Sequence, residues 1–350
     1  MKKAGIIIVN YKDYAEKYLS DCVQSLRQQT WSGEQTLFII DNDSSFESRQ
    51  EISKHAPNSI VLPRSDGNYS AANKLGIEHA MQADCDYLVI ANMDVIFAKN
   101  WLAELIVALD GDENIGVAQS KIMLWPKNQH INSVGNVIHF LGFGFTQGYG
   151  EKDNGQYDKV NLIGGYASGC SLAIKRDVIK TIGNYDETYY MYHDDLEMSW
   201  RAKLAGYKII FAPNSIVYHK YEFSRSVRML YYMERNRYLA IFSFYKIPTI
   251  LLILPALILF EMGMIAYAIF KGWLVIKLQV YVYFFKFQSW THIVRTRKQI
   301  KKYRHIKDKD VVKNFAGKIE FQEIMNPLLK YAVNPIFNLY WRLVRLLIFW

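Results

Sequence analysis

Near its N-terminus the chain reads Ala4-Gly5-Ile6-Ile7-Ile8-Val9-Asn10, a nearly continuous apolar run, rich in β-branched residues, that ends on an amide side chain. Such a run is typical of a parallel strand covered on both faces. Similar runs follow at 36–40, 60–62 and 86–91, and helical patterns lie between them at 14–29, 47–55 and 70–83. This alternation predicts an α/β chain with an open parallel sheet and right-handed crossovers.

Polar side chains stand where these predicted strands end. They are Asn10 after the first strand, Asp41 and Asp43 after the second, and Asn92 and Asp94 after the fourth. Open α/β sheets bind ligands beyond the carboxyl ends of their strands, so three such ends in register favour a nucleotide site. Aspartate also begins turns and helices, and a helix cap at Ser44 or Ser45 is the alternative explanation for Asp41.

Asp94 lies in the motif Ile90-Ala91-Asn92-Met93-Asp94-Val95. A carboxylate at a strand end can hold Mg²⁺ or Mn²⁺ against a diphosphate, because hard cations prefer oxygen ligands. A departing nucleoside diphosphate needs its developing charge neutralised. His219 follows a strand-like run at 215–218, and it either completes a carboxylate-bound Mn²⁺ site or has a structural role.

Two consecutive acids, Asp194 and Asp195, stand in the motif Tyr192-His193-Asp194-Asp195-Leu196-Glu197-Met198-Ser199-Trp200-Arg201. Their mutual repulsion is expected to raise the pKa of one of them, and a helix start would stabilise both. They point about 100° apart on a helix, so one can deprotonate an acceptor hydroxyl while the other holds the helix end. A purely structural acidic cap is the alternative. Glu197 and Arg201 are four residues apart and are expected to pair.

The composition excludes a largely disordered chain, since 51% of the 350 residues are hydrophobic and 21% are charged. The 3 cysteines lie far apart without a CxxC motif, which indicates neither a zinc site nor a disulfide framework and favours a reducing compartment. The apolar run at 4–9 is too short for a signal peptide. We therefore expect the catalytic part in the cytoplasm.

The C-terminal part contains apolar segments that suit a membrane. Ile247–Phe270 could span a bilayer and has Glu261 as its only formal charge, although Pro248, Pro255 and Gly263 are expected to kink or break it. A second apolar stretch, 273–287, is interrupted by Lys277 and Lys286, and residues 341–350 have an interfacial pattern. We expect a domain of residues 1–240 and a membrane-associated helical region of residues 241–350.

A basic cluster follows these segments and carries much of the net charge of +9. It comprises Arg295, Arg297, Lys298, Lys301, Lys302, Arg304, Lys307 and Lys309. Anionic lipid, a solvated helix face and nucleic acid are the possible explanations, and the neighbouring apolar segments favour lipid. Because basic residues stay in the cytoplasm, one full crossing is incompatible with a cytoplasmic catalytic part, whereas a hairpin or helices lying in the interface are compatible.

Together these motifs resemble the family-2 inverting glycosyltransferases of the GT-A fold, in particular bacterial rhamnosyltransferase-like members. The resemblance covers about residues 4–240. It rests on Val9-Asn10-Tyr11, Asp41-Asn42-Asp43-Ser44, Asn92-Met93-Asp94, Ser168-Gly169-Cys170 with Arg176, Tyr185-Asp186-Glu187 leading into Asp194-Asp195, Tyr218-His219 and Glu234-Arg235-Asn236. It implies a Rossmann-like mixed sheet that binds a nucleotide-diphospho-sugar, with a C-terminal membrane-associated region.

The resemblance also implies roles for individual residues. Asp195 corresponds to the general base, and Asp94 and His219 to the Mn²⁺ or Mg²⁺ site. Nucleotide contacts fall on Val9, Asn10, Asp41, Asn73 and Asn92, and acceptor or supporting roles on Asp194, Gly169 and Arg201. The family's usual Asn-x-Gly-Phe is replaced by Asp66-Gly67-Asn68-Tyr69, where we expect Asn68 to keep the turn because asparagine tolerates positive φ.

The function implied is transfer of a sugar to a hydroxyl of a lipid-linked or cell-surface glycan acceptor at the cytoplasmic face of a membrane, the bacterial inner membrane. The QxxRW motif of processive synthases is absent after the acidic pair, which favours single additions. A sugar-nucleotide pyrophosphorylase is the rival enzyme, but residues 10–16 do not resemble its phosphate loop. A membrane-bound scaffold with a degenerate site is the rival without activity. A nucleic-acid partner is not expected, because no recognition module accompanies the basic cluster.

Overall fold

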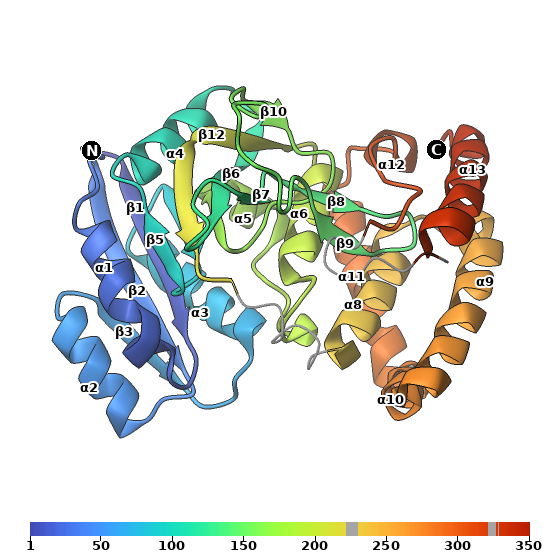
Figure 1. Cartoon of the computed structure of the whole chain (residues 1–350), viewed down its shortest axis with the longest axis horizontal. Helices are drawn as coiled ribbons and strands as arrows, with labels where there is room; N and C mark the ends of the chain where they lie inside the picture. Colours follow the sequence, from blue (N-terminus) through green and yellow to red (C-terminus); the bar gives the residue numbers. More distant parts are fainter. Residues whose placement is uncertain (222–229, 321–326, 328) are drawn as a thin grey trace. The chain divides into compact units, whose positions relative to one another are not determined.

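The computed structural model describes residues 1–221, 230–320, 327 and 329–350. The chain divides into two compact units (Figure 1). The first comprises Met1–Asn136, Thr146–Ala202 and Tyr207–Tyr221, and the second comprises Val137–Phe145, Lys203–Gly206 and the described residues from Leu230 onward. All candidate site residues belong to the first unit, and the boundary expected at residue 240 stays a prediction.

One half of the first unit's main sheet is parallel, as the sequence predicts. It is formed by β1 (Lys3–Asn10), β2 (Glu34–Asn42), β3 (Ile60–Arg64) and β4 (Tyr87–Ala91). β1 lies between β2 and β4, and β3 lies outside β2. The register pairs Asn10 with Asp41 and Ile8 with Ala91, so these strands end at one edge of the sheet.

The other half of the sheet is mixed, which fits the Rossmann-like mixed sheet of the expected fold and limits the parallel prediction to the first four strands. It contains β5 (Val95–Phe97), β6 (Ile115–Leu124), β7 (Ile131–Ser133), β10 (Asn161–Leu162), β11 (Ser171–Lys175) and β12 (Lys208–His219). β11 runs antiparallel to both of its neighbours, β4 and β6, while β12 is parallel to β6 and antiparallel to β5. Two short strands, β8 (Asn136–Ile138) and β9 (Gly144–Thr146), form a separate pair.

The helices of the first unit include the three predicted at 14–29, 47–55 and 70–83. They are η1 (Ala15–Leu19), α1 (Ser20–Leu26), α2 (Phe46–His55), α3 (Tyr69–Gln82), α4 (Trp101–Asp110), α5 (Arg176–Ile182), η2 (Glu187–Tyr189) and α6 (Asp194–Leu204). The helix predicted at 14–29 buries Leu19, Cys22, Val23 and Leu26, but it ends at Leu26 and begins with a π-helical turn. Gly76 of α3 lets this helix approach the sheet, since a Cβ there would lie 2.5 Å from Ile7 Cγ2.

The second unit is helical in its described C-terminal part. Its elements are α8 (Leu230–Phe244), α9 (Ile247–Lys271), α10 (Leu274–Phe285), α11 (Phe287–Tyr303), α12 (Asp308–Val312), η3 (Leu329–Val333), α13 (Asn334–Val344) and η4 (Arg345–Leu347). The expected break at Pro255 or Gly263 is wrong, because α9 is continuous through both and ends at Gly272 in the left-handed conformation. Pro248 sits in the first turn, where no backbone donor is needed, and Pro255 removes a single helical hydrogen bond. Among the described helices, α9 is the one long and apolar enough to cross a membrane.

Candidate active site

The ends of β1 and β2 are joined by a buried hydrogen-bonded pair. Asn10 Nδ2 donates to Asp41 Oδ1 at 2.7 Å, and Asn10 Oδ1 accepts from the Ala15 N–H at 2.8 Å. Ser48 Oγ donates to the second oxygen of Asp41 at 2.7 Å, and both Asn10 and Asp41 are completely buried. Ser45 caps α2 in a reciprocal box with Ser48. The capping alternative is thus correct for Ser45, while Asp41 fixes the spacing of two strand ends and a helix start.

Two further predicted nucleotide contacts lie on α3 and after β4. Asn73 is 1% exposed, and within the described residues no hydrogen bond of normal geometry reaches its amide group, although the Tyr69 hydroxyl lies close to it. Buried amide groups normally have hydrogen-bond partners, and a bound ligand can supply them here. The Asn92 side chain accepts a hydrogen bond from the Tyr69 hydroxyl at 3.1 Å. Val9 lies next to the end of β1 and pairs with Ile40, so its backbone is part of the sheet edge.

Asp94 and His219, the two predicted metal ligands, lie next to each other. Asp94 Oδ1 lies 3.3 Å from His219 Nε2, and both residues are buried. Strand pairing brings these two side chains together. Val95 of β5 pairs with His219 of β12, and the Lys220 N–H donates to the Asp94 carbonyl at 2.9 Å. Asn132 Oδ1 lies 2.9 Å from His219 Nδ1 and orients the ring so that Nε2 faces the carboxylate.

These two side chains fit a divalent cation that also binds a ligand's phosphates. They supply one oxygen and one nitrogen donor, both of which Mn²⁺ accepts. Throughout residues 1–221, 230–320, 327 and 329–350 there is no cluster of three or more His, Cys, Asp or Glu side chains placed to hold a metal. The remaining coordination positions would therefore come from ligand oxygens or water.

Asp195 is held by backbone donors at the start of α6. Its Oδ2 accepts from the Gly169 N–H at 3.1 Å, and its Oδ1 accepts from the Leu196 N–H at 2.8 Å. Burial raises the pKa of Asp195 to about 6, and these two N–H groups limit the rise. The pKa of the neighbouring Asp194 is raised well above its ordinary value, first by burial and then by the charge of Asp195. The sequence predicts a raised pKa for one of the two acids through mutual repulsion; in the structure the pKa of both is raised, and burial is the first cause of each.

The turn before these acids has an unusual backbone. Tyr190, Tyr192 and His193 have φ values of 63°, 61° and 61°, the left-handed region that non-glycine side chains disfavour. Such conformations persist only where the surroundings impose them, and they concentrate at functional sites. Here they bring the chain from η2 into the first turn of α6.

The acid and the metal motif are linked through the end of β11. The Asn92 N–H donates to the Cys170 carbonyl at 3.0 Å, and the adjacent Gly169 holds Asp195. A Cβ at Gly169 would lie 3.7 Å from Asp195 Cβ and 4.0 Å from the Tyr69 hydroxyl. The antiparallel placement of β11 beside β4 thus brings the acid motif to the edge that carries Asn92 and Asp94.

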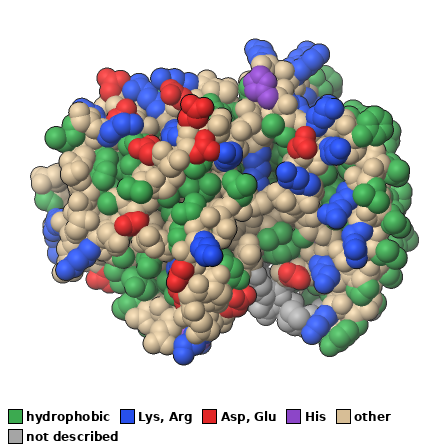
Figure 2. Space-filling view, turned by 90° about the horizontal axis from the view of Figure 1, so that it is seen from above, with side chains coloured by type: hydrophobic (Ala, Val, Ile, Leu, Met, Phe, Trp, Pro, Cys, Tyr) green, Lys and Arg blue, Asp and Glu red, His purple; other side chains and the backbone are tan. Residues whose placement is uncertain are grey.

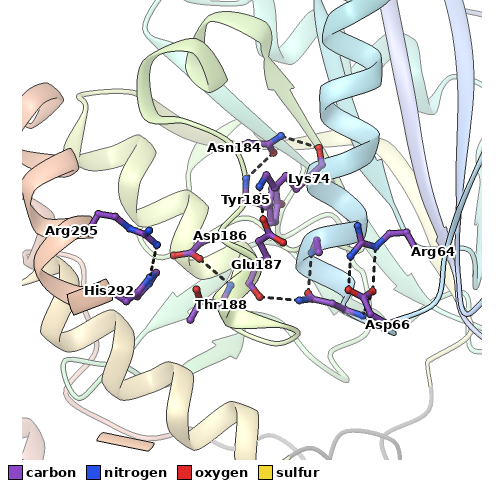
Figure 3. Close-up of polar contacts among 12 residues, drawn as sticks. Arg64, Asp66, Lys74, Asn184, Tyr185, Asp186, Glu187, Thr188, His292 and Arg295 are labelled. Atoms are coloured by element: carbon purple, nitrogen blue, oxygen red, sulfur yellow. Dashed lines mark hydrogen bonds and ion pairs between the residues drawn. The ribbon is translucent and has the colours of Figure 1, made fainter. Parts of the chain in front are cut away.

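The loop that leads to α6 is fastened to α3 (Figure 3). Asn184 Nδ2 donates to the Lys74 carbonyl at 2.9 Å, and Lys74 Nζ lies 2.5 Å from Glu187 Oε1. Asn68 Nδ2 donates to the Glu187 carbonyl at 3.0 Å. Asn68 itself caps α3 with φ −76°, while Gly67 takes the positive φ of +66°, so the turn expected at Asn68 is displaced by one residue. Glycine is the better choice there because it has no Cβ.

The predicted pair of Glu197 and Arg201 is confirmed. Arg201 donates to both carboxylate oxygens of Glu197, at 2.5 Å and 2.7 Å, and the pair is buried. Arg201 also donates to the carbonyls of Ile182 and Asn184. Arg201 therefore holds the chain between α5 and η2 against α6. This is the supporting role, and a contact with the acceptor stays a prediction.

Sequence reasoning missed Asn132, Ser48 and Tyr69. Each acts through a partner that the fold supplies: Asn132 contacts a histidine 87 residues away, and Tyr69 contacts Asn92. Ser48 alone had a local signal, because it lies three residues after a helix-capping serine.

The first 183 residues decide the family. Residues 5–183 match the model of the family described as Glycosyl transferase family 2. The chain belongs to this family. It is 23% identical over 188 residues to the O-antigen chain rhamnosyltransferase WbaN of Salmonella anatum, a match that covers 54% of this chain and 57% of WbaN. Over 247 residues it is 25% identical to the low-salt glycan biosynthesis hexosyltransferase Agl10 of Haloferax volcanii, covering 67% of this chain and 74% of Agl10. The chain thus spans little more than half the length of WbaN.

Solved structures show the same fold. S. aureus TarS 1–349 in complex with UDP has a TM-score of 0.50 at 16% identity, covering 99% of this family-2 chain and 90% of that one. GalNAc-T7 with UDP, GalNAc and Mn²⁺ has a TM-score of 0.52 at 16% identity, covering 67% of this chain and 47% of that one. The chain therefore has the expected GT-A fold, with its α/β sheet in the first unit.

Proposed function

We propose that this family-2 chain is an inverting, non-processive glycosyltransferase that moves one hexose, such as rhamnose, from a nucleotide-diphospho-sugar to a hydroxyl of a lipid-linked or cell-surface glycan. The family match over residues 5–183 supports the reaction class. The relatives named as a rhamnosyltransferase and a hexosyltransferase support the sugar class.

The observation that carries the proposal is the setting of Asp195. One carboxylate, fixed by the Gly169 and Leu196 N–H groups, has a pKa raised to about 6 and is linked through Gly169 and Cys170 to the strand end that bears Asp94. A base works best when its pKa lies near the working pH, because it is then both deprotonated and a good proton acceptor.

The proposed reaction is a single displacement of the nucleoside diphosphate by the acceptor hydroxyl. The acceptor oxygen forms a bond to the anomeric carbon, and its proton passes to Asp195. The bond between that carbon and the diphosphate oxygen breaks, and the nucleoside diphosphate leaves with the electron pair. Attack from the face opposite to the leaving group inverts the anomeric centre.

The donor is held by residues of the sheet edge. We assign the nucleotide site to Val9, Asn10, Asp41, Asn73 and Asn92. The buried pair of Asn10 and Asp41 fixes the shape of this site, and the buried amide of Asn73 favours the assignment. Asp94 and His219 would hold Mn²⁺ or Mg²⁺, and such an ion would supply positive charge to neutralise the leaving diphosphate. Asp194, whose pKa burial raises well above its ordinary value, supports the start of α6, and Gly169 sets the position of the base.

The C-terminal region brings the site to its acceptor at the cytoplasmic face of the cell membrane, in bacteria the inner membrane. The apolar α9 and the basic α11 support contact with membrane lipids. Tethering raises the local concentration of a lipid-linked acceptor.

The experiment is donor hydrolysis by the purified chain across a panel of nucleotide sugars, with Mn²⁺, with Mg²⁺ and with chelator. One donor is expected to be hydrolysed slowly, and chelator or Asp94→Ala is expected to abolish the hydrolysis. Asp21→Ala is the matched control, because Asp21 is an exposed acid on α1 that pairs with Lys220. Absence of both binding and hydrolysis of every donor, in protein whose circular dichroism shows it folded, would contradict the proposal.

A further inference from the structure

The second unit exposes apolar stripes on three helices. On α9 the stripe contains Leu251, Leu254, Ile258, Leu259, Met262 and Ile269, on α10 it contains Val275, Leu278, Val282 and Phe285, and on α13 it contains Ile336, Leu339 and Leu343. The spacing of three and four residues places each set on one side of its helix, and α9 packs against both α10 and α13. Figure 2 shows hydrophobic side chains along an outer edge of this unit, with Lys and Arg side chains beside them. We call the three stripes the apolar face.

On these helices the acidic side chain is paired inside the unit, whereas the exposed charged side chains are basic. Glu261, the acid in the middle of α9, points inward and pairs with Arg237, Lys277, Tyr238 and Tyr281. Lys277 also pairs with the buried Glu234 at 2.7 Å. The charged side chains that α9, α10 and α13 expose are Lys271 and Arg342, both of them cations. Every acid on these helices is thus neutralised inside the protein, while the outer side is apolar with a basic edge.

The chain before α9 and the chain after α10 are tied together. Arg297 of α11 donates to the carbonyls of Phe242 and Tyr245, each at 2.7 Å, and Arg304 donates to the Phe244 carbonyl at 3.1 Å. α8 and α11 also pack against each other. Because α8 precedes α9 and α11 follows α10, both ends of the α9–α10 pair lie on one side of any membrane.

The lengths of α9 and α10 exclude a membrane crossing by this helix pair. A hydrocarbon core of about 30 Å needs about 20 apolar residues in each crossing helix. α9 has 25 residues, but α10, the helix that would have to return, has 12 and spans only about 18 Å. An upright α9 would also carry the paired charges of Arg237 and Lys277 to the bilayer centre.

We infer that the second unit binds an anionic membrane surface without crossing it, with α9, α10 and α13 lying in the interface and their apolar face among the acyl chains. This inference rests on the membrane part of the proposed function and names its surface and geometry. Exposed cations at the edge, together with Arg295, Lys298, Lys301 and Lys302 on α11, complement anionic headgroups. Arg297 and Arg304 take no part, since their guanidinium groups hold α8.

Sidedness tests the geometry. Single cysteines at the two ends of α9, Lys246→Cys and Lys271→Cys, are probed with a membrane-impermeant maleimide in sealed vesicles from producing cells. The three native cysteines are buried, so the background is low. Both positions are expected to react in inside-out vesicles and neither in right-side-out vesicles. Reaction of the two positions from opposite sides would establish a crossing, and reaction of neither in either orientation would place both ends below the headgroups; each result overturns the inference.

Vesicle binding tests the apolar face itself. The full chain is floated with vesicles of phosphatidylcholine and phosphatidylglycerol in equal amounts. Leu259→Glu with Met262→Glu is expected to lower the bound fraction about tenfold or more, because two charges then enter the acyl region. Val107→Glu is the matched control, since Val107 is a 67% exposed apolar residue on α4 of the first unit. Unchanged flotation of the double variant overturns the inference, and so does light scattering that shows it to split a dimer instead.

Donor hydrolysis separates this inference from the proposed function. The double variant is expected to hydrolyse donor as the unmodified chain does, because its substitutions lie far in sequence from every site residue. Loss of vesicle binding with hydrolysis retained supports the membrane surface. Vesicle binding without hydrolysis of any donor by the unmodified chain would refute the proposed reaction and leave the membrane surface standing.

Discussion

At the scale of single residues, the site depends on backbone donors and on neutral side chains as much as on its acids. Asp195 owes its position to the Gly169 N–H, and His219 owes its orientation to Asn132. These partners decide which atoms of each group remain available for a ligand. Each can be tested by a substitution that leaves the acid or the imidazole in place.

Asp195→Asn is expected to lower kcat by a factor of about 10² to 10⁴, the usual contribution of a general base, with little change in donor affinity. Steady-state kinetics gives kcat, and calorimetric titration with the nucleotide gives the affinity. Asp177→Asn on the exposed side of α5 serves as the control. Equal losses in kcat and in nucleotide affinity would mean that Asp195 holds the donor rather than the proton.

The pH profile follows from the raised pKa of Asp195. The carboxyl accepts a proton only when it is ionised, so kcat/KM is expected to rise with pH through about 6 and to fall about tenfold per pH unit below it. The free energy of unfolding is expected to change in the opposite direction. Because the raised pKa of Asp195 favours the protonated folded form, the stability that this group contributes is lost as pH rises from about 4 through about 6. Rates measured in overlapping buffers check the first statement. A rate that does not change below pH 6 would remove Asp195 from the proton transfer.

Asn132→Ala is expected to weaken Mn²⁺ binding about 10-fold to 100-fold, because the histidine ring loses the acceptor that orients it. Electron paramagnetic resonance of free Mn²⁺, with a nucleoside diphosphate present, measures this without any turnover. The exposed Asn128 supplies the control Asn128→Ala. An unchanged Mn²⁺ affinity would separate His219 from the metal.

At the scale of elements, α6 is positioned by an ion pair that also fastens the preceding loop. Glu197 and Arg201 are both buried, and Arg201 bridges from α6 to the carbonyls that follow α5. The strained residues Tyr190, Tyr192 and His193 lie between these two anchors. The loop therefore keeps its left-handed backbone because both of its ends are held.

Arg201→Met is expected to destabilise the chain by about 3–5 kcal/mol, since it leaves the buried Glu197 without its partner. The double variant Glu197→Gln with Arg201→Met is expected to recover part of this loss, because no uncompensated charge remains. Urea unfolding followed by tryptophan fluorescence measures both. A single variant within about 0.5 kcal/mol of the parent would show that the pair is dispensable, as surface substitutions are.

At the scale of the whole molecule, the chain carries a net positive charge, and in the second unit two acids are paired inside the fold while cations are exposed on α11. The net charge is +9, and the second unit neutralises Glu234 and Glu261 internally while α11 exposes a row of lysines. Attraction to an anionic leaflet is long-range and is screened by salt, whereas insertion of the apolar face is not. The two contributions can therefore be separated by ionic strength.

Raising the salt from about 0.1 M to about 1 M shortens the Debye length from about 10 Å to about 3 Å. Binding to phosphatidylglycerol vesicles is expected to weaken but to persist, and binding to pure phosphatidylcholine is expected to change little. Flotation at each salt concentration measures both. Complete release at high salt would reduce the membrane contact to electrostatics alone and remove the apolar face from it.

The sequence by itself determined the first four strands and the helices between them, the polar ends of these strands, the family resemblance and the pairing of Glu197 with Arg201, because periodicity and short spacings are local properties. Only the tertiary structure decided which partners complete the site. The antiparallel insertion of β11 brings Gly169 to Asp195, the antiparallel pairing of β5 with β12 brings His219 to Asp94, and helix packing turns Glu261 inward onto Lys277. The contacts to Asp195 and Asp94 join residues far apart in the chain, and all three depend on packing, which leaves no trace in any local window of sequence. For the same reason the sequence shows only that α9 is long and apolar enough to span a membrane, whereas its packing against α10 and α13 is visible only in the folded unit.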